Sequence, residues 1–253
     1  MSRFEERPLG MAALALLGLA LQGPAAAEPA FLPASRDGEG LFLNEAESIP
    51  HAGAAVTLPF LLRRLGTSLF GRPGAPVRIE NDGAFLRENA THSVPTATWV
   101  GHSTLLVQLD HVTFLTDPIW SDTASPLRGI GRRRFVAPGI ALEALPPIDF
   151  VLISHNHYDH LDADTVERLP DTVAWFVPLG LADWFRARGR ERVVELDWWQ
   201  SAQHGRWTIT CLPSQHWSRR IEQGVNESLW CAWLIDSGTR RYFFAGDTGY
   251  FPV

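Results

Sequence analysis

The chain has 253 residues, 45% of them apolar, so it can bury the core of one large domain or two small ones. Its 28 acidic residues outnumber its 22 basic residues, which gives a net charge of −6 at pH 7 and an isoelectric point near 5.8. Proteins that bind nucleic acid usually carry a basic excess, so this charge argues against a nucleic-acid partner.

The N-terminus has the pattern of an export signal. An apolar run at 11–23 is followed by Ala25-Ala26-Ala27, the small-residue pattern that a signal peptidase accepts before Glu28. We therefore expect residues 1–27 to be a signal peptide and the protein to be exported, in a bacterium to the periplasm. The run is shorter than the roughly 20 residues that span a bilayer. An uncleaved membrane anchor is the alternative.

Residues 28–95 are rich in Pro, Gly and Ala and are expected to form an N-terminal extension that covers the main domain. One stretch, TLPFLLRRLGTSLF at 57–70, predicts an amphipathic helix. Packing of its Leu and Phe side chains on the domain is favoured, and a peripheral contact with a membrane is the alternative.

From Thr96 to Val253 the pattern changes to short β-type runs separated by turn residues. The predicted strands are 97–110, 112–118, 148–155, 174–180, 192–199, 206–213, 229–236 and 241–247. Helices are predicted at 162–169 and 181–189; Asp162 or Asp164 could cap the first, and Asp164 with Glu167 would form a capping box. Strands with interspersed helices predict an α/β or α+β sandwich rather than an all-β barrel.

The segment SHNHYDHLD at 154–162 places three histidines and two carboxylates directly after an apolar strand. On an α-helix, His155 and His157 would point about 200° apart, whereas an extended backbone brings them to one side. Imidazole and carboxylate together suit zinc, or less selectively iron or manganese. His155 and His157 are therefore expected to bind one ion, and Asp159 and His160 a second one. A histidine-rich loop without metal is the alternative.

Two later residues follow apolar runs that would deliver them to the same edge of the sheet. They are His216 in LPSQHWS and Asp247 in FFAGDTGY. Alone, His216 could be a hydrogen-bonded histidine and Asp247 a turn residue. In combination with the first cluster, both are predicted to be metal ligands.

These motifs, together with LTDPIWS, resemble the metallo-β-lactamase superfamily. More narrowly, WVGHSTLLVQLD, LPPIDFVLISHNHYDHLD, ELDWWQS and FFAGDTGY resemble bacterial relatives of the N-acyl-phosphatidylethanolamine-hydrolysing phospholipase D. The resemblance implies an αββα sandwich of the α+β class with a dinuclear zinc site at one edge. By position, His155, His157 and His216 would bind one zinc, Asp159 and His160 the other, and Asp247 would bridge them.

The resemblance also implies a further histidine ligand of the second zinc, from a strand well beyond Asp247, and the closing strands and helix of the domain. The sequence printed here ends at Val253. We therefore expect an incomplete domain, either a fragment or a truncation with a defective second site, that binds one or two zinc ions. The remaining histidines His51, His92, His111 and His204 do not follow a strand in the expected order.

The expected chemistry is hydrolysis of a phosphodiester, with a small molecule or a phospholipid as substrate, by a zinc-bound hydroxide. Asp159 could also take part in proton transfer. A lactonase of the same fold and an inactive, truncated metal-binding chain are the alternatives.

Three further residues are candidates for the surroundings of the metal. Asp117 in LTDP either accepts a hydrogen bond from a ligating imidazole or is a turn residue before proline. His102 in GHST either lines the pocket or belongs to a turn. Trp217, beside His216, is the tryptophan most expected to reach the pocket, since core packing is the usual fate of the others.

Cys211 and Cys231 are the two cysteines of the chain, each in a strand-like run. Their spacing does not match a zinc-binding cysteine pair. Two buried thiols are favoured, and a disulfide, which export would permit, is the alternative.

Overall fold

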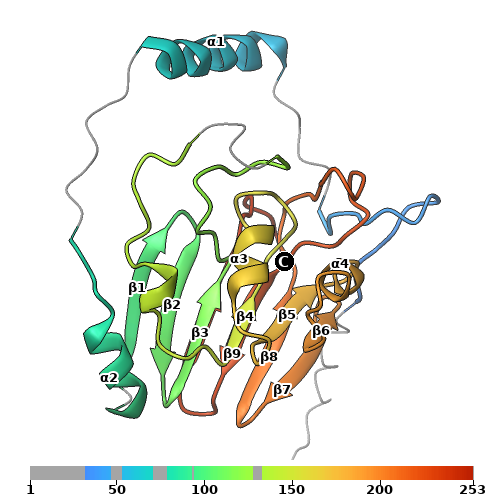
Figure 1. Ribbon diagram of the computed structural model, residues 1–253. Coiled ribbons are helices and arrows are strands. Elements are labelled where there is room, and N and C mark those ends of the chain that lie inside the picture. Colours follow the sequence, from blue (N-terminus) through green and yellow to red (C-terminus); the bar gives the residue numbers. More distant parts are fainter. Residues whose placement is uncertain (1–31, 47–52, 71–78, 93, 128–132, 253) are drawn as a thin grey trace, which may run out of the picture. The chain divides into compact units, whose positions relative to one another are not determined.

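The computed structural model describes residues 32–46, 53–70, 79–92, 94–127 and 133–252 (Figure 1). The predicted signal peptide at 1–27 and His51 lie outside the described residues. No helix within the described ranges is both long enough and apolar enough to span a bilayer.

The first sheet has six strands in the order in which they occur along the chain. They are β1 (Thr96–Gly101), β2 (Thr104–Leu109), β3 (Val112–Thr116), β4 (Phe150–Leu152), β5 (Ala174–Pro178) and β6 (Val193–Leu196). The first three strands pair antiparallel, and β3 to β6 pair parallel, so the carboxyl ends of the parallel strands share the upper edge in Figure 1. The single run predicted at 97–110 is thus a hairpin of two strands.

The second sheet has four antiparallel strands in the order β10-β9-β8-β7. They are β7 (Ser201–His204), β8 (Trp207–Leu212), β9 (Ala232–Asp236) and β10 (Arg241–Phe244). The sequence reading missed β7, because its residues Ser-Ala-Gln-His lack an apolar run. It forms as an edge strand that pairs with β8 from Ser201 opposite Thr210 to His204 opposite Trp207.

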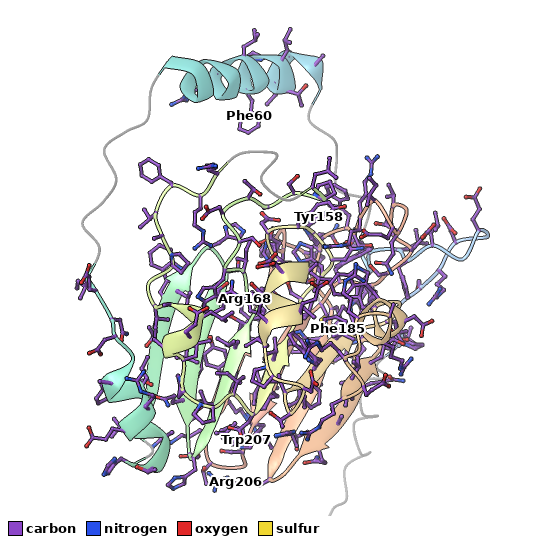
Figure 2. All side chains as sticks on the ribbon, in the orientation of Figure 1. Phe60, Tyr158, Arg168, Phe185, Arg206 and Trp207 are labelled. Carbon is purple, nitrogen blue, oxygen red and sulfur yellow. The ribbon has the colours of Figure 1, made fainter. Side chains whose placement is uncertain are left out.

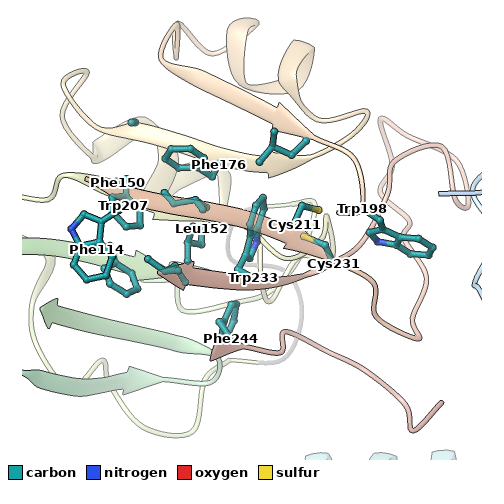
Figure 3. Packing of buried hydrophobic residues seen from close by; sticks show 14 of the residues in the cluster. Phe114, Phe150, Leu152, Phe176, Trp198, Trp207, Cys211, Cys231, Trp233 and Phe244 are labelled. Carbon is teal, nitrogen blue, oxygen red and sulfur yellow. The ribbon is translucent and has the colours of Figure 1, made fainter. Parts of the chain in front are cut away.

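The two sheets pack face to face around an aromatic core (Figure 3). The ring of Phe114 stacks on that of Phe150 at 4.8 Å between centroids. The indole Nε1 of Trp233 on β9 donates to the carbonyl oxygen of Ile153 at 2.9 Å, which ties the second sheet to the end of β4. This core holds the sheets in register directly beneath the histidine segment.

Cys211 and Cys231 lie in the same core as free thiols, so the favoured prediction for the cysteines agrees with the structure (Figure 3). Burial raises the pKa of the Cys231 thiol well above its usual value, because a thiolate would lose its hydration there.

Three helices cover the other face of the six-stranded sheet: α2 (Ala84–His92), α3 (Ala163–Arg168) and α4 (Ala182–Arg186). Their apolar side chains join those of β2 to β5 in a second buried cluster. A short 3-10 turn lies at Leu142–Ala144. The helices thus form one layer, which covers the six-stranded sheet, and the six-stranded sheet packs on the four-stranded sheet. The predicted α+β sandwich is therefore confirmed.

Helix α3 corrects one detail of the sequence reading. It begins after Asp162, so Asp164 lies inside the first turn and the capping box predicted with Glu167 is wrong. The Asp162 carboxylate makes no cap hydrogen bond with its own helix. It accepts instead from the backbone N–H of Ser121 at 3.0 Å and from the Ser121 hydroxyl at 2.7 Å, and so ties the helix to the loop after β3.

Parts of the predicted N-terminal extension belong to the folded unit. Phe42 is fully buried in the core between the sheets, and the backbone N–H of Ala34 donates to the Asp197 carboxylate at 3.0 Å. Helix α1 (Ala54–Phe70) forms over the predicted amphipathic stretch. Its Val56, Leu58, Phe60 and Leu62 side chains are 57–64% exposed, so the packing favoured for this helix is not observed for them.

Candidate metal centre

The histidine segment leaves the carboxyl end of β4 at the upper edge of the six-stranded sheet. Strand β4 is completely buried, and its side chains anchor the start of the segment. The chain then has no regular secondary structure through His157 and turns at 158–160, where the backbone N–H of His160 donates to the His157 carbonyl at 3.0 Å. Figure 2 shows Tyr158 of this turn at the upper edge and Trp207 at the opposite edge.

The first group of potential ligands consists of three imidazoles, those of His155, His157 and His216. Nε2 of His155 lies 2.8 Å from Nδ1 of His157, and Nε2 of His216 lies 3.2 Å from the same Nδ1. Tetrahedral zinc with bonds of about 2.0–2.1 Å places neighbouring ligand atoms about 3.3 Å apart. The three nitrogen atoms therefore fit the spacing of ligands around one ion.

The second group consists of His102, Asp159 and His160. Nε2 of His102 lies 3.3 Å from Nε2 of His160 and 3.1 Å from Oδ2 of Asp159. These distances match the same spacing of about 3.3 Å between ligands of one ion.

Asp247 lies between the two groups. Its Oδ1 is 3.4 Å from Nε2 of His160, and its Oδ2 is 3.9 Å from Nε2 of His216. The six residues predicted as ligands thus meet at one edge of the sheets, and each oxygen of the Asp247 carboxylate faces a histidine of a different group.

Asp117, at the end of β3, is the carboxylate that orients the histidines of both groups. It is completely buried, and its Oδ2 accepts from Nδ1 of His160 at 2.7 Å. This bond keeps a proton on Nδ1 and points Nε2 toward the second group, where a metal ion would take the place of the Nε2 proton. The same carboxylate accepts from the backbone N–H and the hydroxyl of Ser154, at 2.7 Å and 2.5 Å.

Ser154 passes this orientation on to the first group. Because its hydroxyl proton is donated to Asp117, its oxygen accepts from Nδ1 of His155 at 2.9 Å. Nε2 of His155 is therefore left with a lone pair that faces His157. The sequence reading missed Ser154; the only signal was a hydroxyl residue directly before the first histidine.

Burial and charge make the two groups electrostatically different. Burial, with neighbouring imidazoles, holds the pKa of His155 well below its ordinary value, lowers that of His157 to about 4 and also lowers that of His216. Burial also disfavours the charged form of His160, but its hydrogen bonds with Asp117 and Asp247 outweigh this effect and raise its pKa to about 10.

The carboxylates show the complementary shifts. Burial disfavours the charged form of Asp159, but the hydrogen bond with His102 and the charge of His160 hold its pKa well below the ordinary value. The hydrogen bond with His160 likewise lowers the pKa of Asp247. Both carboxylates are therefore ionised at neutral pH and carry the negative charge that a cation requires.

Two residues support the first group from outside the histidine segment. The Trp217 ring packs edge-on against that of His157, with centroids 4.3 Å apart. Asn44 holds the backbone of His216 through two hydrogen bonds, donating to its carbonyl at 2.9 Å and accepting from its N–H at 3.0 Å. Asn44 was not predicted, since nothing in its sequence surroundings links it to a residue 172 positions away.

A pocket of about 840 Å³ opens beside the second group. His102 and Asp159 lie on its wall, and most of the remaining wall is apolar, including Val100, Ile119 and Phe135. Arg134 also lines it; its Nη2 donates to the Ile119 carbonyl at 3.1 Å, while Nε and Nη1 are buried without a hydrogen-bond partner among the described residues.

A family described as Beta-lactamase superfamily domain matches residues 112–253, which include all six predicted ligands. The chain belongs to the beta-lactamase superfamily. The matched segment begins at β3 and covers both sheets except for the β1–β2 hairpin, so superfamily membership accounts for the sandwich that presents the ligands.

Relatives of known name agree with this membership. The N-acyl-phosphatidylethanolamine-hydrolyzing phospholipase D 1 of Caenorhabditis elegans is 44% identical over 169 residues, 62% of this chain and 48% of that protein. The mitochondrial protein of that activity name in Saccharomyces cerevisiae is 35% identical over 160 residues, 60% of this chain and 34% of that protein. The chain thus spans half or less of the length of these relatives.

A solved structure shows the same fold. A possible metal-dependent hydrolase from Veillonella parvula DSM 2008 superimposes with a TM-score of 0.51 at 17% sequence identity, covering 63% of this chain and 64% of that one.

Proposed function

We propose that the protein is a zinc-dependent hydrolase that cleaves phosphodiesters in the manner of a phospholipase D. The observation that carries the proposal is the convergence of two ligand groups on Asp247, beside a pocket that reaches Asp159. The naming of the C. elegans relative, 44% identical over the shared segment, supports this choice of bond.

Bound zinc would lower the pKa of a water molecule to about 7 and neutralise charge on a phosphoryl oxygen. The protein supplies the orientation. Asp117 and Ser154 fix the ring nitrogens that face the two groups, and Asp159 stays ionised next to the pocket. Its free oxygen can accept the proton of an attacking water, since Oδ2 is engaged with His102.

The pocket supports an anionic substrate with a long apolar part. Its wall is mainly apolar, which suits acyl chains, and Arg134 is the arginine among its described lining residues. Among the described residues, two buried nitrogens of this guanidinium have no hydrogen-bond partner, and a guanidinium binds phosphate oxygens through paired hydrogen bonds. A phospholipid offers both features, whereas a lactone offers only the apolar one.

Side-by-side assays test the proposal. The zinc-loaded protein is supplied with N-acyl-phosphatidylethanolamine in mixed micelles and with an acyl lactone of matched chain length. We expect turnover of the phosphodiester, and lactone turnover alone would overturn the proposal in favour of a lactonase. Replacing Arg134 by Gln should raise KM for the phosphodiester about 10-fold or more, as loss of a charged hydrogen bond does, and leave KM for any lactone unchanged.

The proposal includes an exported, envelope-associated enzyme. The sequence at 1–27 supports export, and the exposed apolar side chains of α1 support contact with lipid. N-terminal sequencing of the protein purified from the periplasm should begin at Glu28. A first residue of Met1 in the membrane fraction would favour the anchor instead.

A further inference from the structure

We propose that His102 is a ligand of the second metal ion, which it binds together with Asp159, His160 and Asp247. The inference rests on the proposed function, since it requires the chain to bind metal. It assigns to His102 a role beyond those expected from the sequence, which were to line the pocket or to form a turn.

The position of the imidazole nitrogen carries the inference. Nε2 of His102 lies within 3.3 Å of Nε2 of His160 and 3.1 Å of Oδ2 of Asp159, the separation of neighbouring ligands on one zinc. Since Nδ1 of His160 is bound to Asp117, it is Nε2 of His160 that faces His102. Two ring nitrogens and a carboxylate oxygen this close together need a proton or a cation between them, and zinc can take that place.

No other candidate for this place is found in the described part of the chain. His92, His111 and His204 belong to neither ligand group, whereas His102 completes the group of Asp159 and His160. With Asp247, the second ion then has two imidazoles and two carboxylates, a donor set that suits zinc.

The turn that carries His102 is held rigidly against the segment that carries Asp117. The Thr104 hydroxyl donates to the Asp117 carbonyl at 2.7 Å, and the Thr116 hydroxyl donates to the Ser103 carbonyl at 2.8 Å. Both threonines are completely buried. A ligand position is precise when its support is rigid, and these two hydrogen bonds join the turn of His102 to the segment whose carboxylate orients His160.

The backbone of His102 also has an unfavourable conformation. Its φ is +51°, in the left-handed region that side chains other than glycine rarely adopt. Glycine would fit this turn more easily. Since His111 has a similar φ outside both groups, the conformation alone assigns no role, and the inference rests on the position of Nε2.

The experiment measures zinc binding rather than turnover. Zinc per chain and the dissociation constant of each equivalent are determined for the wild-type protein, for His102→Ala and for His111→Ala. His111 is a matched control, because it has a φ of +67° at the next hairpin turn and belongs to neither ligand group. Circular dichroism and retention of the first equivalent report that each variant is folded.

We expect two equivalents in the wild-type protein and in His111→Ala. In His102→Ala the second equivalent should weaken more than about 100-fold, beyond the 10–100-fold loss that follows removal of a residue that only orients a ligand. An unchanged second equivalent in His102→Ala, or a single wild-type equivalent bound by His155, His157 and His216, would overturn the role of His102 but not the metal-binding function. A wild-type chain that binds no zinc would refute both.

A direct measurement needs no substitution. In wild-type protein with 15N-labelled histidine, the ring nitrogens are assigned from the backbone and followed during addition of zinc. We expect Nε2 of His102 to acquire the chemical shift of a coordinated nitrogen with the second equivalent. A shift typical of a protonated Nε2 that donates to Asp159 would contradict coordination, even if His102→Ala does not fold.

Discussion

The two ligand groups lie side by side but are built differently. The group of His155, His157 and His216 is all imidazole, whereas the group of His102, Asp159 and His160 mixes imidazole with carboxylate. Each takes two residues from the histidine segment and a third from elsewhere, 59 positions away in the first group and 58 in the second. The side chain of His216 is 15% exposed, whereas those of His102 and Asp159 are 48% and 47% exposed.

This difference separates two ways of preparing a metal site. In the first group, burial keeps neutral imidazoles with lone pairs available to a cation. In the second group, carboxylates hold a proton on His160, and a cation must replace that proton. The first group can bind a cation without losing a proton, whereas in the second group the cation must displace the proton of His160.

The largest expected effect follows loss of the first group. Replacing His155 and His157 together by Ala removes two of its three nitrogen ligands, so the first equivalent should weaken by more than about 100-fold. Zinc analysis after dialysis checks this. His204→Ala, which changes a histidine outside both groups, is the control. Unchanged zinc content in the double variant would refute the assignment of ligands.

Loss of Asp117 should affect both groups, since it orients His160 directly and His155 through Ser154. We expect Asp117→Asn to weaken both equivalents by about 10–100-fold, the usual cost of removing a partner that orients a metal ligand. Titration calorimetry with zinc measures both constants. If only the second equivalent weakens, the hydrogen bonds through Ser154 do not transmit the loss of Asp117 to His155 and the first group.

Gly246 offers a smaller perturbation, next to Asp247 and against Ser154. A Cβ there would lie 2.5 Å from Cβ of Ser154, and its φ is +60°. Gly246→Ala should therefore destabilise the fold by about 1–3 kcal/mol and weaken both equivalents, since Ser154 orients His155 and Asp247 faces both groups. Gly205→Ala is the matched control, with a φ of +58° and nothing within 4 Å of the added Cβ. Equal losses of unfolding free energy in urea would show that the backbone strain at positive φ, which both variants share, accounts for the whole effect and that the contact with Ser154 adds nothing.

The smallest effect is a difference in released protons. The pKa of His157 is near 4, so at pH 7 the first group is neutral and its ion displaces no proton. The pKa of His160 is raised to about 10, so the second ion displaces one proton, and its affinity should increase about tenfold per pH unit between pH 7 and 10. Calorimetry in buffers of different ionisation enthalpy counts these protons, and equal release by both equivalents would contradict the comparison.

The sequence predicted all three residues of the first group and Asp159 and His160 of the second, because each of them lies in a segment that follows an apolar run. His155 and His157 follow a strand with a spacing that an extended or looped backbone, but not a helix, converts into one site, and His216 ends another apolar run. The strands were also predictable wherever they are apolar, as β4 and β9 are. Strand β7 was not, since an edge strand with a polar sequence is formed by pairing with its neighbour.

The surroundings of the second group could not be predicted for a different reason. His102 lies in a hairpin turn within the run 97–110, which was predicted as one strand. The sequence therefore did not indicate that His102 lies beside the residues that follow β4. Ser154 and Asn44 act through hydrogen bonds to His155 and His216, and no spacing rule encodes such contacts. Asp162 or Asp164 was predicted to cap α3. Asp162 does occupy the N-cap position, but its carboxylate binds the Ser121 loop instead of the helix N–H groups.

The left-handed backbone at His102 has an evolutionary consequence. Glycine relaxes such a conformation by about 0.5–1 kcal/mol, so His102→Gly should melt at a higher temperature than His102→Ala. Selection for stability alone would favour glycine at position 102, just as it would at 111. A lineage that keeps histidine there accepts a less stable turn, and comparing the residues at these two turns among homologues would show which of them is maintained by a trade-off between stability and catalysis.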